Sequence, residues 1–235
     1  MSIQNQPTIY NTPTIYNAVK SGWEISIATI NGHQYQTIKK DGVEWLAQNF
    51  NEILPGLTLA DNDDYSPYTS GRNQCYRFGA IKTDYDKNGL IKFCGTCYRS
   101  GARNIINTAL ASDGWHVPSR SEWNALINSL DDIEDLCIPN TPGDYNLLYG
   151  KNKTGLSIIT APNPGGSSLS DFDFKFGDVS TDFMVNELAQ GRGDDYVVLI
   201  SFLNGRPNVN GPYYNYTYNG STWNKKYFVR LVRNI

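Results

Sequence analysis

The side chains best suited to contact another molecule gather near the end of the chain. Ten of the twenty-one residues from Asn204 to Asn224 are Asn or Tyr. Tyr supplies a large, rigid surface and Asn supplies adaptable hydrogen bonding, which is the composition of antibody paratopes. We therefore predict a ligand-contacting surface here, the alternative being a plain hairpin in which Tyr is only a strand former. The expected contact residues are Asn204, Arg206, Asn208, Asn210, Tyr213, Tyr214, Asn215, Tyr216, Tyr218, Asn219, Ser221, Trp223 and Asn224.

Residues that could carry out acid–base or covalent chemistry are sparse. The only histidines are His33 and His116, and the second lies in a Gly-Trp-His-Val-Pro block where a structural histidine is expected. No nucleophile elbow, P-loop or zinc-protease motif occurs. We therefore expect a binding protein without enzymatic activity, and we expect no cofactor.

The four cysteines leave several interpretations open. They are Cys75, Cys94, Cys97 and Cys137, and the middle two form a CxxC pair. Such a pair can be half of a zinc site, a redox pair or part of a disulfide framework. No second CxxC or nearby His completes a zinc set, so buried thiols or a structural bridge are the favoured interpretation.

Two acidic stretches could attract calcium. Residues 84–89 match the first half of an EF-hand loop, but its twelfth position is Gly95, where a bidentate Glu is required. They therefore predict a polar turn, and a structural calcium ion has no complete motif to support it. Residues 61–64 form a second acidic cluster, at which metal binding stays open.

Composition excludes several classes of protein. The 235 residues are 40% hydrophobic and 18% charged, which is typical of a folded domain. Because the net charge is −3 and no long basic run occurs, we expect no nucleic-acid partner. No run of about 18 apolar residues could cross a bilayer. The first residues lack a secretory signal, so we expect either a trimmed leader or another route of release, such as lysis.

The elements that must position the contact residues are mostly short strands. Apolar and polar residues alternate from Trp23, with Ile25, Ile27 and Thr29 in one row, and Asn31-Gly32 predicts a hairpin to residues 34–38. A turn at residues 41–42 then leads into a strand over residues 43–50.

Further strands are expected on both sides of the Asn- and Tyr-rich stretch. The apolar run of residues 196–202 predicts a central strand, and residues 227–233 predict an alternating closing strand. Residues 76–80 predict a short strand or the start of a helix. Few helices, many short strands and long loops together predict an α+β fold.

The clearest helix follows Pro118. Ser119 is an N-cap candidate, and Glu122 three residues later completes a capping box. One apolar face at helical spacing is formed by Trp123, Leu126, Ile127 and Leu130.

Residues 1–22 form a separate N-terminal arm. Pro7-Thr-Ile-Tyr-Asn11 is repeated as Pro13-Thr-Ile-Tyr-Asn17, and its prolines exclude an internal helix or a central strand. The arm is either a mobile tail or an extended segment that docks onto a partner subunit. Residues 23–235 are expected to form one ligand-binding domain, with residues 196–233 as its variable-region-like segment.

Four sequence blocks carry a family resemblance. Residues 41–50, 114–123, 155–157 and 229–233, in this order, resemble the Fibrobacter succinogenes major paralogous domain, a branch of the C-type-lectin-like fold. The resemblance spans about residues 35–235. It implies an α+β core of short strands with few helices, whose N- and C-terminal strands pair and whose long loops carry the ligand surface.

Residues 204–224, placed before the closing strand, are similar to the variable regions that diversity-generating retroelements randomise on this same fold. Randomised template adenines convert Asn codons into codons for Asn, Tyr, Ser and Asp. This resemblance implies a receptor-binding protein of a phage tail in the virion, often a homotrimer, that meets a bacterial surface protein or glycan. The alternative is a bacterial cell-surface or secreted, extracellular binding protein of lectin-like fold.

The chain also departs from these relatives. Residues 197–201 replace the Trp-Ser-Ser-Thr-like strand of the family, and neither 206–208 nor 223–225 completes a calcium-and-sugar motif. Calcium-dependent sugar binding is therefore not expected. Formylglycine-generating enzymes share the fold and use a cysteine pair near the C-terminus, whereas the last cysteine here is Cys137, so such an enzyme is the least favoured alternative.

Overall fold

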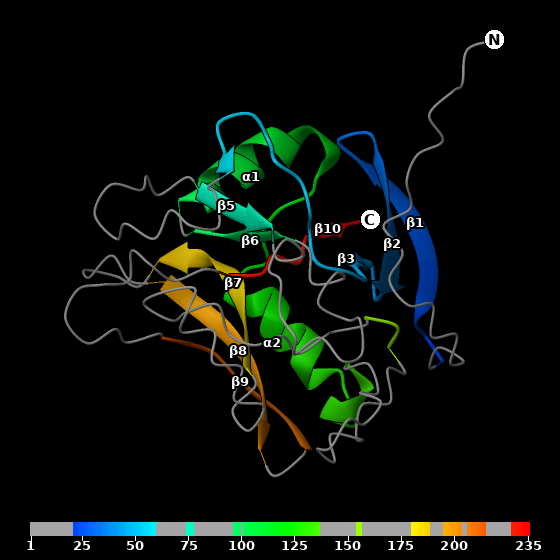
Figure 1. Ribbon diagram of the computed structural model, residues 1–235. Coiled ribbons are helices and arrows are strands. Elements are labelled where there is room, and N and C mark those ends of the chain that lie inside the picture. The colour runs from blue at the N-terminus through cyan, green and yellow to red at the C-terminus, as the bar shows by residue number, and fades with distance from the viewer. Residues whose placement is uncertain are drawn as a thin grey trace, which may run out of the picture.

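The computed structural model describes residues 21–59, 74–77, 96–99, 101–136, 154–156, 180–188, 195–203, 206–214 and 227–235. Residues 1–20, in which the arm is predicted, and the acidic stretches 61–64 and 84–89 lie outside the described residues. The described strands form three sheets, with two α-helices beside them (Figure 1).

The first sheet is antiparallel and has the order β1-β2-β3-β10. Its strands are β1 (Glu24–Ile30), β2 (His33–Lys40), β3 (Val43–Leu46) and β10 (Val232–Asn234). Both turns of the meander have left-handed backbones at each central residue, with φ of 50° and 81° at Asn31-Gly32 and 49° and 78° at Asp41-Gly42. These are the conformations of two-residue hairpin turns, so the predicted hairpins are confirmed. The third strand ends at Leu46, earlier than the predicted residue 50.

Strand β1 places its apolar row on the outside of the sheet. Ala28 and Ile30 are buried, whereas Ile25 is 41% exposed and Ile27 is 61% exposed. Because successive side chains of a strand point to opposite faces, the row that includes both isoleucines faces away from the core. The described part of β1 therefore presents an apolar outer surface.

The closing segment differs from its prediction. Only Val232–Asn234 form a strand, and every residue from Tyr227 to Val232 is buried, so the predicted alternation of buried and exposed side chains is wrong. The segment is buried on all sides because it runs between the sheets and is bridged to each of them. Its isolated bridges are Tyr98 with Tyr227, Phe183 with Phe228, and His116 with Val232.

Two three-stranded sheets complete the strands. One contains β4 (Thr58–Leu59), β5 (Gln74–Arg77) and β6 (Thr96–Tyr98), so the stretch predicted as either a strand or a helix from residue 76 begins in a strand. The other contains β7 (Ser180–Leu188), β8 (Asp195–Leu203) and β9 (Arg206–Tyr214). As predicted for the apolar run of residues 196–202, β8 is the central strand of this sheet.

The helices are short. Helix α2 (Arg120–Asn128) begins with the predicted capping box, because the Ser119 side chain accepts from the backbone of Glu122 while the Glu122 side chain accepts from the backbone of Ser119. It is followed by a 3₁₀ turn at Ile133–Asp135. Helix α1 (Ala102–Leu110), followed by a 3₁₀ turn at Ala111–Asp113, was not predicted.

A chain of aromatic rings joins the first sheet to the third. Trp123 of α2 packs against Trp45 of β3 at 5.0 Å and against Phe183 of β7 at 5.5 Å, measured between ring centroids. Phe183 in turn lies 6.4 Å from Phe228 of the closing segment. The buried Arg230 guanidinium donates to the carbonyl oxygens of Leu46 (3.1 Å) and Leu156 (2.9 Å). The third sheet is thus held to the core through β7 and the closing segment.

Candidate functional site: the outer face of β9

Strand β9 carries five of the thirteen predicted contact residues. They are Arg206, Asn208, Asn210, Tyr213 and Tyr214. The other eight lie outside the described residues: Asn204, Asn215, Tyr216, Tyr218, Asn219, Ser221, Trp223 and Asn224. The structure describes the backbone of β9, and the register of its pairing with β8 places these positions on the two faces of the sheet.

The register puts three of the predicted residues on one face. The paired positions of β8 and β9 are Leu203 with Arg206, Ser201 with Asn208, and Leu199 with Asn210. Because the positions in each strand are two residues apart, they share a face.

A shift in register decides where the two tyrosines lie. The pairing slips between Asn210 and Tyr213, so that Tyr213 lies opposite Val197 and Tyr214 lies opposite Tyr196. An irregularity of this kind re-aims the residues that follow it. Since Val197 is two residues from Leu199, Tyr213 stays on the face of Asn210, and Tyr214 occupies the other face. The predicted set is therefore divided between the two faces of the sheet.

Helix α2 identifies the covered face. Phe183 of β7 lies opposite Val198, and its ring packs on Trp123 of α2. The face that contains Phe183 and Val198 therefore lies toward α2, which runs beside this sheet in Figure 1. The face of Asn208 and Asn210 is the opposite one, and we call Arg206, Asn208, Asn210 and Tyr213 the β9 face set.

The residue types at paired positions agree with this assignment. On the α2 side, the row of Thr181, Ile200 and Val209 is mainly apolar, whereas the next row, of Asp182, Leu199 and Asn210, mixes polar and apolar residues. One step further, Ser180, Ser201 and Asn208 form a wholly polar row. The row of Met184, Val197 and Tyr213 on this same face is not solvated throughout, because Met184 is fully buried in the hydrophobic core, so the polar rows lie at the end of the face that contains Ser180. The β9 face set thus includes members of the polar rows, toward the end of the sheet that contains Ser180.

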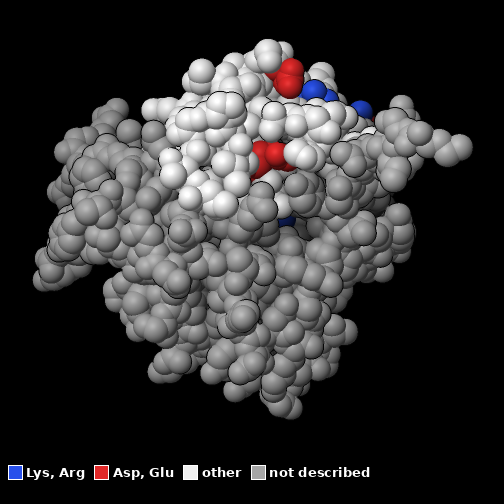
Figure 2. Space-filling model, turned by 45° about the horizontal axis from the view of Figure 1, so that its top comes forward, with Lys and Arg blue, Asp and Glu red and all other residues white. Residues whose placement is uncertain are grey.

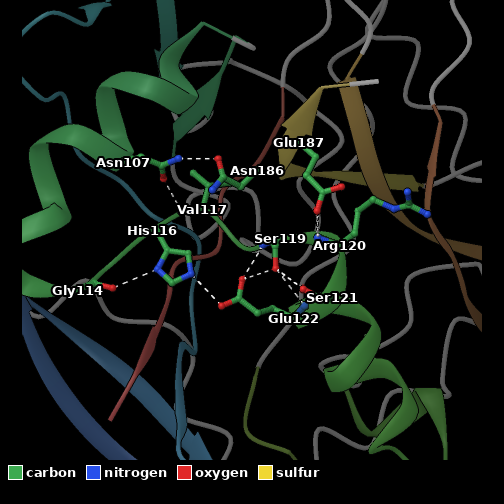
Figure 3. A network of polar contacts seen from close by, with 10 residues as sticks. All are labelled: Asn107, Gly114, His116, Val117, Ser119, Arg120, Ser121, Glu122, Asn186 and Glu187. Carbon is green, nitrogen blue, oxygen red and sulfur yellow. Dashed lines mark hydrogen bonds and ion pairs between the residues drawn. The ribbon is translucent and has the colours of Figure 1, made fainter. Parts of the chain in front are cut away.

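Strand β7 anchors this sheet to the rest of the domain. Its Met184 amide donates to the Phe228 carbonyl (2.9 Å), and its Asn186 amide donates to the Pro118 carbonyl (2.8 Å). Asn107 of α1 bridges the same region, donating to the Asn186 side chain at 2.7 Å and accepting from the Val117 amide at 2.8 Å (Figure 3). Contacts from both helices therefore fix β7, the strand furthest from β9 in this sheet.

The most prominent polar network surrounds the start of α2 (Figure 3). His116 contacts Glu122 through Nε2 (2.9 Å) and the Gly114 carbonyl through Nδ1 (3.1 Å). The other carboxylate oxygen of Glu122 accepts from the amide and the hydroxyl of Ser119, both at 2.7 Å. Since Ser119 contacts the carboxylate and not the imidazole, the histidine is not placed to take the serine proton. The arrangement caps a helix and does not resemble a catalytic triad.

Both partners of this network have shifted pKa values. The hydrogen bond with Glu122 raises the pKa of His116 above 6.5, against the opposite effect of partial burial. Burial acts to raise the pKa of Glu122, but the hydrogen bonds from His116 and Ser119 outweigh it and lower that pKa below 4.5. Because carbonyl and carboxylate oxygens both accept, the two contacts of His116 fit the protonated ring, in which both nitrogens donate.

A second polar cluster lies beneath the first sheet. The Glu52 carboxylate accepts from the Tyr35 hydroxyl (2.6 Å) and contacts His33 Nδ1 (2.8 Å). The Tyr98 hydroxyl donates to the Glu52 carbonyl at 2.9 Å. Burial, reinforced by Glu52, raises the pKa of Tyr35, and burial raises that of Tyr98. Both phenols therefore remain protonated donors that hold the chain after β3.

Metal ligation has no candidate group in the described ranges. Among those residues, no three of His, Cys, Asp or Glu are close enough together to hold an ion. Cys75 and Cys97 are buried, and they lie opposite Tyr98 and Tyr76, which places them on opposite faces of β5 and β6. The register therefore does not direct these two cysteines at each other; Cys94 and Cys137 lie outside the described residues.

Comparisons with known proteins add no relative. No family model matches the chain, and neither a curated protein nor a solved structure is similar to it. In the part of the chain that the structure describes, none of the helices combines the length and apolar composition needed to cross a membrane. The candidate site therefore stands on the residues and the strand register alone.

Proposed function

We propose that this chain is a receptor-binding protein, of the kind found on phage tails, that contacts a bacterial surface protein or glycan. The contact surface is the β9 face set together with the Asn- and Tyr-rich residues that follow it. The observation that carries the proposal is the register of β9, which brings Arg206, Asn208, Asn210 and Tyr213 to the sheet face opposite α2. We further propose a C-type-lectin-like fold, supported by the pairing of β3 with β10.

The arrangement suits a surface that can change while its support stays constant. Hydrogen bonds and ring contacts secure β7, and α2 and the 3₁₀ turn at Ile133–Asp135 lie against β9 as well. Because the β9 face set lies on the face opposite α2, substitutions there leave the packing of Trp123 on Phe183 in place. Paratopes in general combine a rigid framework with exchangeable Tyr and Asn residues in this way.

Recognition by this surface depends on shape and hydrogen bonds more than on net charge. The chain carries a net charge of only −3. Figure 2 shows one face of the molecule, most of which is not described, and its small described part carries a few acidic and a few basic atoms among uncharged ones. Long-range steering needs a broad surface of one sign, so the affinity is expected to depend only weakly on salt.

Substitution of the β9 face set tests the assignment. Changing Asn208, Asn210 and Tyr213 together to Ala is expected to weaken binding of the fluorescently labelled protein to bacterial cells by roughly 30-fold, which corresponds to about 2 kcal/mol. Binding is measured by flow cytometry on a panel of Gram-negative and Gram-positive cells. Because these positions lie on the face opposite α2, the thermal midpoint is expected to stay within about 2 °C of wild type.

A matched control uses asparagines on the exposed surfaces of the two helices. Asn104, Asn124 and Asn128 are exposed, and changing all three to Ala is expected to leave cell binding unaltered. Full binding by the β9 variant, or equal losses in both variants, contradicts the assignment of the site. Absence of binding by the wild-type protein to any cell in the panel argues against the receptor-binding function itself.

The neighbouring DNA tests diversification separately. A reverse-transcriptase gene is expected nearby, together with a near-copy of the coding sequence for residues 204–224 that differs mainly at adenines. Sequencing of the flanking region checks this directly. Lack of any template copy removes the argument for diversification but leaves the binding surface to be judged by the substitutions.

A further inference from the structure

The pairing of β8 with β9 shows which backbone groups of β9 point away from the sheet. Leu203 and Arg206 are paired and are separated by two residues, so they form the hydrogen-bonded pair that closes a two-residue hairpin. Hydrogen-bonded positions recur at every second residue, which directs the amide of Asn208 toward β8. The nitrogens of residues 207 and 209 therefore point to the outer edge of β9, which has no partner among the described strands.

The other side of the sheet confirms this alternation. Residues of β8 that do not direct their backbone groups at β9 direct them at β7, so the amides of their partners Thr181 and Phe183 face β8. The amide of Met184 must then point away from β8. It does so, because it donates to the carbonyl of Phe228 in the closing segment at 2.9 Å. A single alternation of hydrogen bonds thus runs across all three strands.

Beyond the register shift, the outward positions include the second proline of the strand. The alternation continues along β8 without a break, so Val197 directs its backbone groups at β9, where its partner is Tyr213. The two neighbours of Tyr213 in the chain, Pro212 and Tyr214, therefore direct their nitrogens outward. Outside the shift itself, the outward positions of β9 are 207, 209, 212 and 214, and the first and third of these are proline.

Proline at these two positions removes hydrogen-bond donors from the edge of the sheet. Proline has no amide hydrogen, and within sheets it is found on edge strands, with its nitrogen directed away from the neighbouring strand. An added strand needs donors along the whole edge, whereas Val209 stands between two positions that cannot donate. Proline on an edge strand is one of the means by which native proteins prevent a sheet from pairing with another chain.

A sheet can bind a partner in two ways. An extended peptide can add a strand at an edge, where main-chain hydrogen bonds supply the affinity, or a partner can lie across a face and contact side chains. The two missing donors disfavour strand addition at β9. Binding across the face depends on the β9 face set, so the identity of those side chains then decides which partner binds.

We infer that Pro207 and Pro212 close the outer edge of β9 to strand addition, so that the ligand of the β9 face set binds across the face of the sheet. The surface fits a partner with a preformed surface of its own, and not an unstructured peptide segment that would complete the sheet. The mode of ligand binding rests on the proposed function, whereas the closure of the edge does not. The same closure keeps the β9 edges of two copies from pairing with each other.

Amide hydrogen exchange of the full wild-type chain, measured by NMR, tests the closure directly. After correction for intrinsic rates, the Val209 amide is expected to exchange about 100-fold faster than the Asn208 amide, because only the Asn208 amide faces β8. A Val209 amide as strongly protected as that of Asn208 means that another strand covers the edge, and it overturns the inference. The measurement needs no ligand, so its outcome does not depend on the proposed function.

A variant with both donors supplied tests the role of the prolines. Pro207→Thr combined with Pro212→Thr adds an outward amide at each position, and Thr suits a strand. The mass of this variant in sedimentation velocity is expected to rise between about 5 µM and about 200 µM, whereas the mass of the wild-type chain stays constant. Asn208→Thr combined with Asn210→Thr is the matched control, because it adds the same residue type without an outward donor.

The control variant is expected to sediment as the wild-type chain does. A constant mass for the proline variant, or an equal rise for the control variant, overturns the role given to the prolines. Thermal unfolding establishes beforehand that each variant folds. If the proline variant does not fold, the exchange rate of the Val209 amide in the wild-type chain decides the inference.

Binding to bacterial cells tests the mode of recognition. At a protein concentration at which the proline variant does not associate, it is expected to bind within about threefold of wild type, because its β9 face set is unchanged. If the ligand adds a strand to β9, the two supplied donors strengthen binding about tenfold, and any gain above about threefold overturns binding across the face. Absence of wild-type binding contradicts the proposed function, while exchange and sedimentation still decide whether the edge is closed.

Discussion

His116 and Glu122 carry the most informative titration among the described residues. The raised pKa of His116 means that its protonated form stabilises the folded state below about pH 6.5, an effect that is lost as the pH rises through the folded value. The lowered pKa of Glu122 means that its charged form stabilises the fold above about pH 4.5, and this is lost as the pH falls through the folded value. Between about pH 4.5 and about pH 6.5, His116 and Glu122 both make their full contribution to the stability of the folded state.

Replacement of His116 is therefore expected to have a pH-dependent effect. His116→Gln keeps a polar side chain but cannot become charged, and it should lower the free energy of unfolding by about 1 kcal/mol at pH 5.5. The deficit should shrink as the pH is raised to 8.5, because wild-type His116 then loses its proton. Urea unfolding at the two pH values measures it, and a deficit that is the same at both contradicts the role of the charged pair.

Composition marks the proposed contact residues but could not predict which face of the sheet each occupies. The density of Asn and Tyr between residues 204 and 224 marks the stretch without any structure. That Tyr213 and Tyr214 lie on opposite faces depends on a register shift after Asn210. A register shift of one residue moves every later side chain of the strand to the opposite face of the sheet. Gly211-Pro212 indicates that the strand is irregular here, but it does not show by how many residues the register shifts.

Among the elements, those with local signals could be predicted. The Asn31-Gly32 and Asp41-Gly42 turns and the capping box of α2 involve residues only a few positions apart, so their physical basis is visible in the sequence. Helix α1 has no side-chain cap and no acidic residue in its first turn. It buries Ala102, Ile106 and Leu110 in the core, so its stability comes from packing that the sequence alone does not display.

The capping box gives a prediction for α2. Ser119→Ala removes the acceptor for the Glu122 amide and should lower the free energy of unfolding by about 1 kcal/mol. Ser121→Ala is the matched control, because the Ser121 hydroxyl contacts only the Ser119 hydroxyl, at 2.9 Å, among its described contacts. Chemical denaturation compares the two variants, and a loss for Ser121→Ala as large as that for Ser119→Ala speaks against a specific cap.

At the scale of the whole molecule, β10 joins the two ends of the domain. Arg233 forms an ion pair with the buried Glu44 at 2.7 Å, and Glu44 also accepts from the Thr37 hydroxyl at 2.6 Å. Composition and periodicity could not predict that β10 pairs with β3, because the two strands lie nearly two hundred residues apart in the sequence. Only the family resemblance implied this pairing. The sheet order and the bridging closing segment depend on such contacts.

Removal of residues 232–235 should therefore be severely destabilising. It deletes β10 and leaves the Glu44 carboxylate buried without its guanidinium partner, which costs several kcal/mol. The thermal midpoint is expected to fall by about 10 °C or more, or the cooperative transition to disappear. Ile235→Ala is the control, because this side chain is 61% exposed, and its midpoint should stay within about 2 °C of wild type. A truncated chain as stable as wild type overturns the role given to β10.

The burial of the closing segment has a genetic consequence. Residues 227–232 are encoded after the Asn- and Tyr-rich stretch and are wholly buried. A stop codon or a frameshift anywhere between residues 204 and 224 therefore deletes or scrambles the segment that bridges the sheets. Such products cannot complete the core and would be removed by cellular proteases. Only the products of altered genes that preserve the reading frame would fold. Proteolysis of the unfolded products would therefore select among the variants before any of them contacts a ligand.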